Sequence, residues 1–170
     1  YLWRTGALHL YQSIDLADHA TLRNTLWGGT LCNDALLEKD GADGSDYRMV
    51  GDPTEGAMMV AGAKAGYWRD ELERVFPRVN EIPFDSDRKR MTTIHGLDGA
   101  DAEGICPVAC AKSGAGFVAV VKGAPDLVLD KCTTYQTGAG PVELTAEKRQ
   151  EVLDANAALA SQALRVLAVA

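Results

Sequence analysis

Three short segments carry polar or charged side chains where the packing of a hydrophobic core would not require them. They are Gly-Asp-Pro-Thr-Glu at residues 51–55, Pro-Phe-Asp-Ser-Asp-Arg-Lys-Arg-Met at residues 83–91, and Val-Lys-Gly-Ala-Pro-Asp at residues 121–126. Phe84 offers an aromatic face on which a base can stack, and Lys122 offers an ammonium group for phosphates. Glu55 can accept a hydrogen bond from an exocyclic amine. Together, these residue types favour a binding site for a purine nucleotide.

Each of these side chains also has a structural explanation. Glu55 follows Asp52 at the spacing of a capping box, so its carboxylate can return to the backbone of the cap. Phe84 follows a proline and is by default a core residue, while the Arg-Lys-Arg run at 88–90 is by default a solvated turn or pairs with neighbouring aspartates. Lys122 ends an apolar strand and needs a partner, which a structural carboxylate can supply.

Motifs for several other kinds of chemistry are missing from the sequence. No Gly-Lys-Ser/Thr triple exists for a P-loop, and no Gly-x-Ser-x-Gly exists for a serine hydrolase. The Gly-x-Gly-x-x-Ala at 114–119 precedes a predicted strand, whereas a dinucleotide fingerprint follows a strand and opens a helix. Kinase signatures beyond a glycine-rich loop are also missing. A metal site from Cys106, Cys110 and His95 rests on one Cys-x-x-x-Cys pair, and free thiols are the favoured interpretation of the cysteines.

Composition limits the possible partners. The 170 residues include 17 Lys and Arg against 24 Asp and Glu, which gives a formal charge of −7. This balance argues against nucleic acid or an anionic membrane surface as the main partner. We find no apolar run of about 20 residues that could span a bilayer, and no secretory leader. A single domain, residues 1–170, in the cytoplasm is therefore expected.

Local patterns predict helices first and strands mainly in the middle of the chain. Gly and Asp residues predict a loop at 39–47. Asp52 and Pro53 predict the start of a helix, and this helix is expected to end near Gly66. The other predicted helices cover residues 15–32, 69–75 and a long segment capped by Thr145, and the predicted strands cover residues 79–84, 91–95, 105–111, 117–121 and 165–170. A glycine-rich turn at 113–116 predicts a hairpin. The fold class expected is α/β in the broad sense (α+β), an antiparallel or mixed sheet with helices packed against it.

The motifs as a set resemble the cytoplasmic nucleotide-binding domain of P-type cation-transporting ATPases, most closely the type II, calcium-pump-like group. In the order of that family, they are Cys-Asn-Asp-Ala at 32–35, Gly-Asp-Pro-Thr-Glu-Gly-Ala at 51–57, Phe-Asp-Ser-Asp-Arg-Lys-Arg-Met at 84–91, Lys-Gly-Ala-Pro-Asp at 122–126 and Leu-Arg-Val-Leu-Ala at 164–168. The resemblance implies a twisted, largely antiparallel sheet flanked by helices.

The resemblance also implies residue roles. Phe84 would stack on adenine, Glu55 would bind near the adenine amine, and Lys122 would line the base of the pocket. Lys89 and Arg165 would approach the phosphates, and the remaining pocket wall would be Thr54, Met91, Gly123 and Leu167. Ser86 stands where some relatives carry a basic residue for the phosphates, so Lys89 and Arg165 would carry more of that contact. Asp126 replaces the more usual Glu of the motif.

One family motif, Asp-Lys-Thr-Gly-Thr, is missing, and its aspartate accepts the γ-phosphate. The resemblance therefore implies a domain excised from a longer membrane ATPase, which binds ATP without hydrolysing it. Its partners would be ATP and the phosphorylation and actuator domains of the same polypeptide, with Mg²⁺ used by the full-length pump but no metal ligand in this chain. The alternative is a catalytically silent scaffold or protein-interaction domain.

Overall fold

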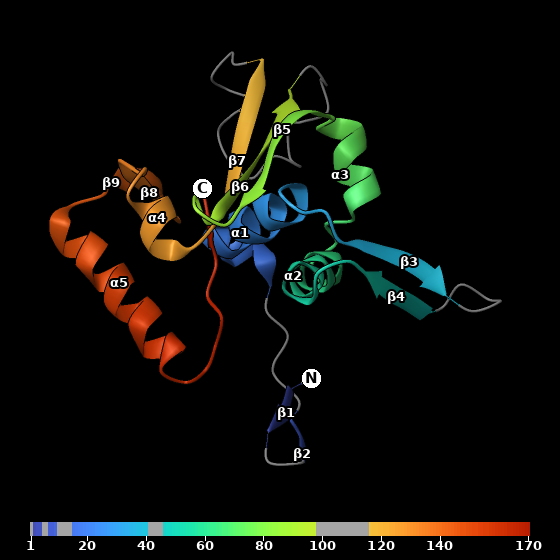
Figure 1. Cartoon of the computed structure of the whole chain (residues 1–170), viewed down its shortest axis with the longest axis horizontal. Helices are drawn as coiled ribbons and strands as arrows, with labels where there is room; N and C mark the ends of the chain where they lie inside the picture. Colours follow the sequence, from blue (N-terminus) through green and yellow to red (C-terminus); the bar gives the residue numbers. More distant parts are fainter. Residues whose placement is uncertain (1, 5–6, 10–14, 41–45, 98–115) are drawn as a thin grey trace.

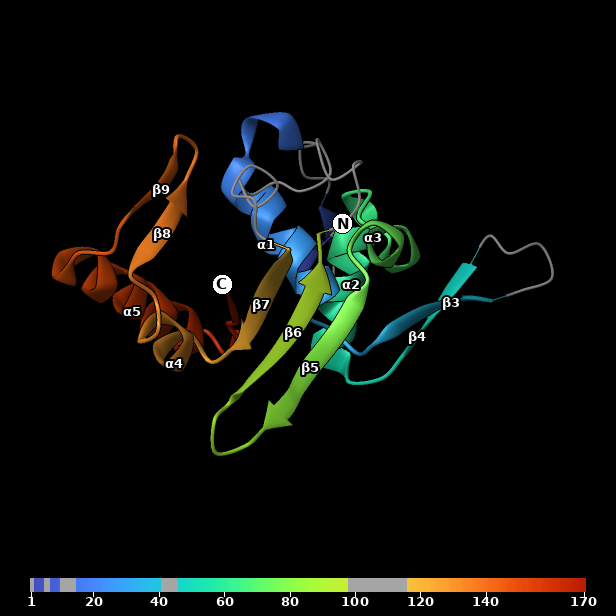
Figure 2. The same cartoon turned by 90° about the horizontal axis from the view of Figure 1, so that it is seen from above.

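A four-stranded antiparallel sheet forms the centre of the molecule (Figure 1). The computed structural model describes residues 2–4, 7–9, 15–40, 46–97 and 116–170. Within these, the strand order of the sheet is β10-β7-β6-β5. The bounds are β5 Arg78–Asp85, β6 Arg90–Gly96, β7 Phe117–Gly123 and β10 Ala168–Val169. Figure 2 shows β5, β6 and β7 side by side, seen from above.

Three helices follow one another along the first half of the chain and pack together beside this sheet. They are α1 Ala20–Leu31, α2 Pro53–Lys64 and α3 Arg69–Val75, with the short 3₁₀ helix η1 Leu16–Asp18 ahead of them. α1 contacts both other helices and also β7. On β6 the residues Met91, Thr93 and His95 are buried, while those between them are half-buried. This alternation is the pleat of a strand with one face against a core.

The core lies between α1, α3 and the sheet. Its buried members are Trp27, Leu31, Cys32, Leu72, Phe76, Met91 and Val120. Trp27 and Phe76 meet edge to face, with ring centroids 5.4 Å apart. Burial raises the pKa of the Cys32 thiol, so this cysteine is held as a neutral apolar side chain.

Three two-stranded antiparallel hairpins extend from this centre. They pair β1 Leu2–Arg4 with β2 Ala7–His9, β3 Leu36–Asp40 with β4 Asp46–Val50, and β8 Thr134–Thr137 with β9 Gly140–Glu143. The chain also forms α4 Pro125–Leu129 and α5 Ala146–Ala160. α4, α5 and the β8–β9 hairpin lie together on one side of the sheet, opposite the β3–β4 hairpin (Figure 1).

The expected α+β class and antiparallel sheet are confirmed, together with α2 capped by Asp52 and α5 capped by Thr145. The loop predicted at 39–47 is wrong at both ends, because β3 continues to Asp40 and β4 begins at Asp46. Most residues of this hairpin are exposed, so its strands carry no hydrophobic alternation to reveal them. The strand predicted at 165–170 shortens to Ala168–Val169. The predicted strand at 105–111 and residues 113–115 of the predicted turn lie outside the described residues.

Candidate functional site

The first turn of α2 fixes Thr54 and Glu55. Asp52 precedes the helix, and its Oδ1 accepts hydrogen bonds from the Thr54 amide at 2.8 Å and the Glu55 amide at 3.3 Å. These backbone donors, that of Glu55 foremost, hold the pKa of Asp52 below its ordinary value. Pro53 fits the first helical position because no intrahelical partner exists there for an amide hydrogen. The side chains of Thr54 and Glu55 therefore start from a rigid backbone.

The Glu55 carboxylate joins two segments distant in sequence. Its Oε1 lies 2.7 Å from Lys122 Nζ on β7, and its Oε2 accepts the Asp34 backbone amide at 3.0 Å. The Lys122 side chain is 6% exposed and that of Glu55 is 19% exposed. The capping-box alternative is therefore wrong for Glu55, because a buried ammonium is a stronger partner for a carboxylate than a backbone amide at an exposed helix start. The partner expected for Lys122 is this same glutamate.

Phe84 lies close to this ion pair in the strand register. Met91 is directly opposite Lys122, and Asp85 is opposite Arg90. Phe84 precedes Asp85 at a register shift between Ile82 and Asp85, which places it next to Met91 across the two strands. Met91 is buried, but Phe84 is 62% exposed. The default interpretation of Phe84 as a core residue is thus wrong, and an exposed aromatic ring stands in one row with a buried methionine and a buried lysine.

Thr54, the residue before Glu55 on α2, lies close to two other predicted site residues, Arg165 and Leu167. Arg165 Nη1 donates a hydrogen bond to Thr54 Oγ1 at 2.8 Å, which joins the segment before β10 to the start of α2. Thr54, Arg165 and Leu167 line a groove of about 550 Å³ between α1, α2 and the C-terminal segment. Since Thr54 and Glu55 are consecutive, this groove and the Glu55–Lys122 pair share the first turn of α2.

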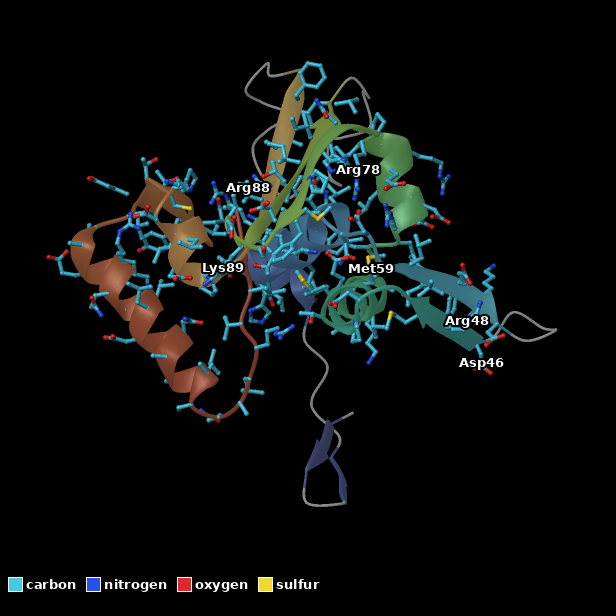
Figure 3. All side chains as sticks on the ribbon, in the orientation of Figure 1. Asp46, Arg48, Met59, Arg78, Arg88 and Lys89 are labelled. Atoms are coloured by element: carbon cyan, nitrogen blue, oxygen red, sulfur yellow. The ribbon has the colours of Figure 1, made fainter. Side chains whose placement is uncertain are left out.

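The turn between β5 and β6 brings Lys89 close to Gly123, beside Lys122. Lys89 has a positive φ of 48°, and its carbonyl accepts the Ala124 amide at 3.0 Å. A Cβ on Gly123 would come within 2.4 Å of the same carbonyl oxygen, so only glycine permits this approach. Figure 3 shows Lys89 and Arg88 at the end of the sheet that faces α4.

The cations of this turn differ in how they are held. The Arg88 guanidinium donates to the Pro83 carbonyl at 2.8 Å and lies near Asp85, whereas the Lys89 ammonium has no hydrogen bond or ion pair among the described residues. Backbone amides, that of Arg88 first, hold the pKa of Asp85 below its ordinary value. Ser86 is exposed at the tip of the turn. Lys89 is therefore the cation of this turn that is available to an anionic ligand.

Two further residues, Asn33 and Arg78, support the position of Glu55. The residue types that favour a nucleotide site did not point to either of them. Asn33 is fully buried and its Nδ2 donates to the Glu55 carbonyl at 3.0 Å. Arg78, the first residue of β5, donates to the carbonyls of Leu31 and Asn33 and to the Asp34 carboxylate. The Cys-Asn-Asp sequence at 32–34 is a motif of the family that it resembles, but its residue types alone do not indicate a site. Arg78 carried no local signal, because an arginine at a strand start is ordinary.

Within residues 15–40, 46–97 and 116–170, no cluster of His, Cys, Asp and Glu side chains could hold a metal ion. His95 is fully buried, with its ring nitrogens 2.9 Å from the Phe76 carbonyl and 2.9 Å from Thr93 Oγ1. Cys106 and Cys110, its proposed companions in a metal site, lie outside the described residues. None of the helices described is long and apolar enough to cross a bilayer.

Comparisons with known proteins agree on one relationship. A family model described as P-type ATPase, cytoplasmic domain N, matches residues 21–170. The chain is 40% identical over 150 residues to "Probable cation-transporting ATPase F" of Mycobacterium tuberculosis (strain ATCC 25618 / H37Rv), a match that covers 88% of the chain and 14% of that protein. It is 35% identical to "Calcium-transporting ATPase 1" of Bacillus cereus over 82% of the chain and 13% of the relative. For "Calcium-transporting ATPase" of Bacillus subtilis, the identity is 33%, over 94% of the chain and 16% of the relative. The chain thus spans only a small part of the length of these relatives.

Proposed function

The chain belongs to the P-type cation-transporting ATPases, as their cytoplasmic domain N, and on this premise we propose that it binds ATP and presents the γ-phosphate to an aspartate in a separate phosphorylation domain. Residues 1–170 would then be one nucleotide-binding domain of a longer membrane ATPase, lying in the cytoplasm. The observation that carries the proposal is the row of Phe84, Met91 and Lys122 across β5, β6 and β7, with Lys122 paired to Glu55.

The side chains of this row offer the kinds of contact that adenine can make. The exposed ring of Phe84 offers a stacking surface, and the buried Met91 beside it adds an apolar floor. Glu55 Oε1 and Oε2 each accept one hydrogen bond, from Lys122 and from the Asp34 amide. A carboxylate has about four acceptor positions, so Glu55 retains capacity for the adenine amine.

Two cations near the site, Lys89 and Arg165, would bind the phosphates. Lys89 lies in the turn beside Gly123, with its ammonium unpaired within the described residues. Arg165, in the segment before β10, lies against the start of α2. One of its nitrogens donates to Thr54, and its other donors are left for a ligand. Ser86 and Leu167 would complete the wall. The described residues offer no ligand cluster for Mg²⁺, so the metal would arrive with the phosphates and its protein ligands would lie elsewhere in the pump.

A scaffold that keeps the fold for contacts with the other domains remains the second candidate. The observation in its favour is the Glu55–Lys122 pair itself, because each charge already has a partner without nucleotide. Against it, a purely structural pair gives no reason for an exposed Phe84 next to Met91.

Titration of the chain with ATP, followed by calorimetry and by amide and side-chain NMR shifts, tests the proposal. We expect saturable binding, with the largest shifts at Phe84, Lys122 and the first turn of α2. Absence of saturable shifts at these positions would favour the scaffold. Phosphate release by the chain alone would contradict the proposed division of labour, provided that it is lost in Lys122→Ala. Release that survives this substitution would come from a contaminating ATPase.

A further inference from the structure

The Glu55 carboxylate is oriented by a turn that itself lies outside the predicted nucleotide contacts. This turn covers residues 32–35, directly after α1, and we call it the Cys32–Ala35 turn. We propose that Asn33 and Arg78 are positioning residues, which hold the Cys32–Ala35 turn so that the Asp34 amide fixes Glu55 toward the adenine amine and thereby sets the preference for adenine. This inference rests on the proposed function.

Asn33 braces the turn from inside. Its side chain is fully buried, and Nδ2 donates to the carbonyl of Gly29 at 3.2 Å and to that of Glu55 at 3.0 Å. Its Oδ1 accepts the Ala35 amide at 2.9 Å. One amide group therefore links α1, the Cys32–Ala35 turn and the first turn of α2. Because the Asn33 side chain is fully buried, its donors and acceptor are costly to leave without partners.

Arg78 braces the same turn from outside. Nη2 donates to the carbonyls of Leu31 at 3.1 Å and Asn33 at 2.6 Å, which satisfies backbone acceptors at the C-terminal end of α1 and just beyond it. Nη1 lies 2.8 Å from Asp34 Oδ1 and 2.8 Å from Glu81 Oε2. A single planar guanidinium thus fixes both the carbonyl that precedes the Asp34 amide and the Asp34 side chain. Lysine or methionine could not reproduce this fork.

The result is a carboxylate with a defined direction. The Asp34 amide and Lys122 Nζ each hold one oxygen of Glu55, and Asn33 holds its main-chain carbonyl. If the Cys32–Ala35 turn relaxes, Lys122 still pairs with Glu55, but the second oxygen loses its fixed donor. Recognition of the adenine amine would weaken, while stacking on Phe84 and phosphate contacts would remain. A general loss of folding would lower all of these together.

Comparison of ATP with inosine triphosphate separates the two cases, since inosine carries an exocyclic carbonyl oxygen, an acceptor, in place of the adenine amine. We expect the wild-type chain to prefer ATP by about 10-fold, the lower end for a hydrogen bond to a charged group. Asn33→Ala and Arg78→Met should each lower this preference to within about 3-fold of the value for Glu55→Ala. In the Glu55→Ala background, Asn33→Ala should change the preference no further.

Thr30→Ala is the matched control. Thr30 is also fully buried near the end of α1, but within the described part of the chain its hydroxyl bonds only the Leu26 carbonyl of its own helix. It should lower thermal stability and leave the ATP preference at the wild-type value. Near-UV circular dichroism establishes that each variant is folded. If Asn33→Ala is unfolded, Arg78→Met carries the test, because its side chain lies at the edge of the core.

An unchanged preference in a folded Asn33 or Arg78 variant would overturn the inference, as would equal losses for both nucleotides. A wild-type chain that binds the two nucleotides equally would also overturn it, while leaving ATP binding intact. A wild-type chain that binds neither would refute the proposed function itself.

Discussion

Replacement of Phe84 by alanine separates a nucleotide contact from a core position. Phe84 is 62% exposed, so roughly a third of its surface is removed from water in the folded chain. Full burial of such a side chain contributes about 1.5–3 kcal/mol, and Phe84→Ala should therefore cost no more than about 1 kcal/mol of the free energy of unfolding. A core phenylalanine would cost about 3–5 kcal/mol.

The expected loss of ATP affinity is larger than this loss of stability. Stacking of a base on an aromatic side chain is worth about 1–3 kcal/mol by alanine substitution, which corresponds to an increase of about 5- to 150-fold in Kd. Phe117 is the matched control, because it is 61% exposed on β7 of the same sheet, at the far end from Lys122. Phe117→Ala should have a similar small effect on stability and none on ATP affinity.

Calorimetric titration with ATP and urea unfolding, measured on the same preparations, provide both quantities. The reasoning is refuted if Phe84→Ala binds ATP as the wild type does, or if Phe84→Ala and Phe117→Ala weaken ATP binding equally. A loss of unfolding free energy near 4 kcal/mol would instead identify Phe84 as a core residue and remove it from the pocket.

Three further predictions concern the surroundings of the site. Gly123→Ala should lower thermal stability strongly, since the new methyl group meets the Lys89 carbonyl oxygen at 2.4 Å; an unchanged melting temperature would contradict the close approach. Lys122→Met should cost about 3 kcal/mol of unfolding free energy, because it leaves the Glu55 carboxylate without its buried ammonium partner. In urea unfolding, the double variant with Glu55→Gln should recover part of that loss. No recovery would mean that the broken ion pair is not the cause of the loss. Burial lowers the pKa of His95, so the folded state favours the neutral ring. The free energy of unfolding should therefore be highest above about pH 6.5 and should fall as the pH drops below that value. In His95→Gln the melting temperature should depend less on pH between 7 and 5, and an equal dependence would assign the effect to other groups.

Local sequence signals were sufficient wherever a single segment decides its own conformation. Asp52 and Pro53 predicted the start of α2, and Thr145 predicted that of α5, because a cap is satisfied by the next few residues. The strands β5 and β6 were predicted with the turn between them. The β3–β4 and β8–β9 hairpins were not predicted, because most of their residues are exposed or only half-buried. α4 was also missed, since its five residues are too few for a periodic pattern.

The amino-acid sequence is enough to identify the family and the residues that form the candidate site. Five motifs in a fixed order identify the P-type ATPase domain, and the comparisons confirm this. How those residues contact one another depends on the tertiary structure. Whether Glu55 caps its own helix or pairs with Lys122, 67 positions away, depends on where β7 comes to lie against α2. The exposure of Phe84 and the bracing of Glu55 by Asn33 and Arg78 depend likewise on packing between distant segments, which local spacing does not encode.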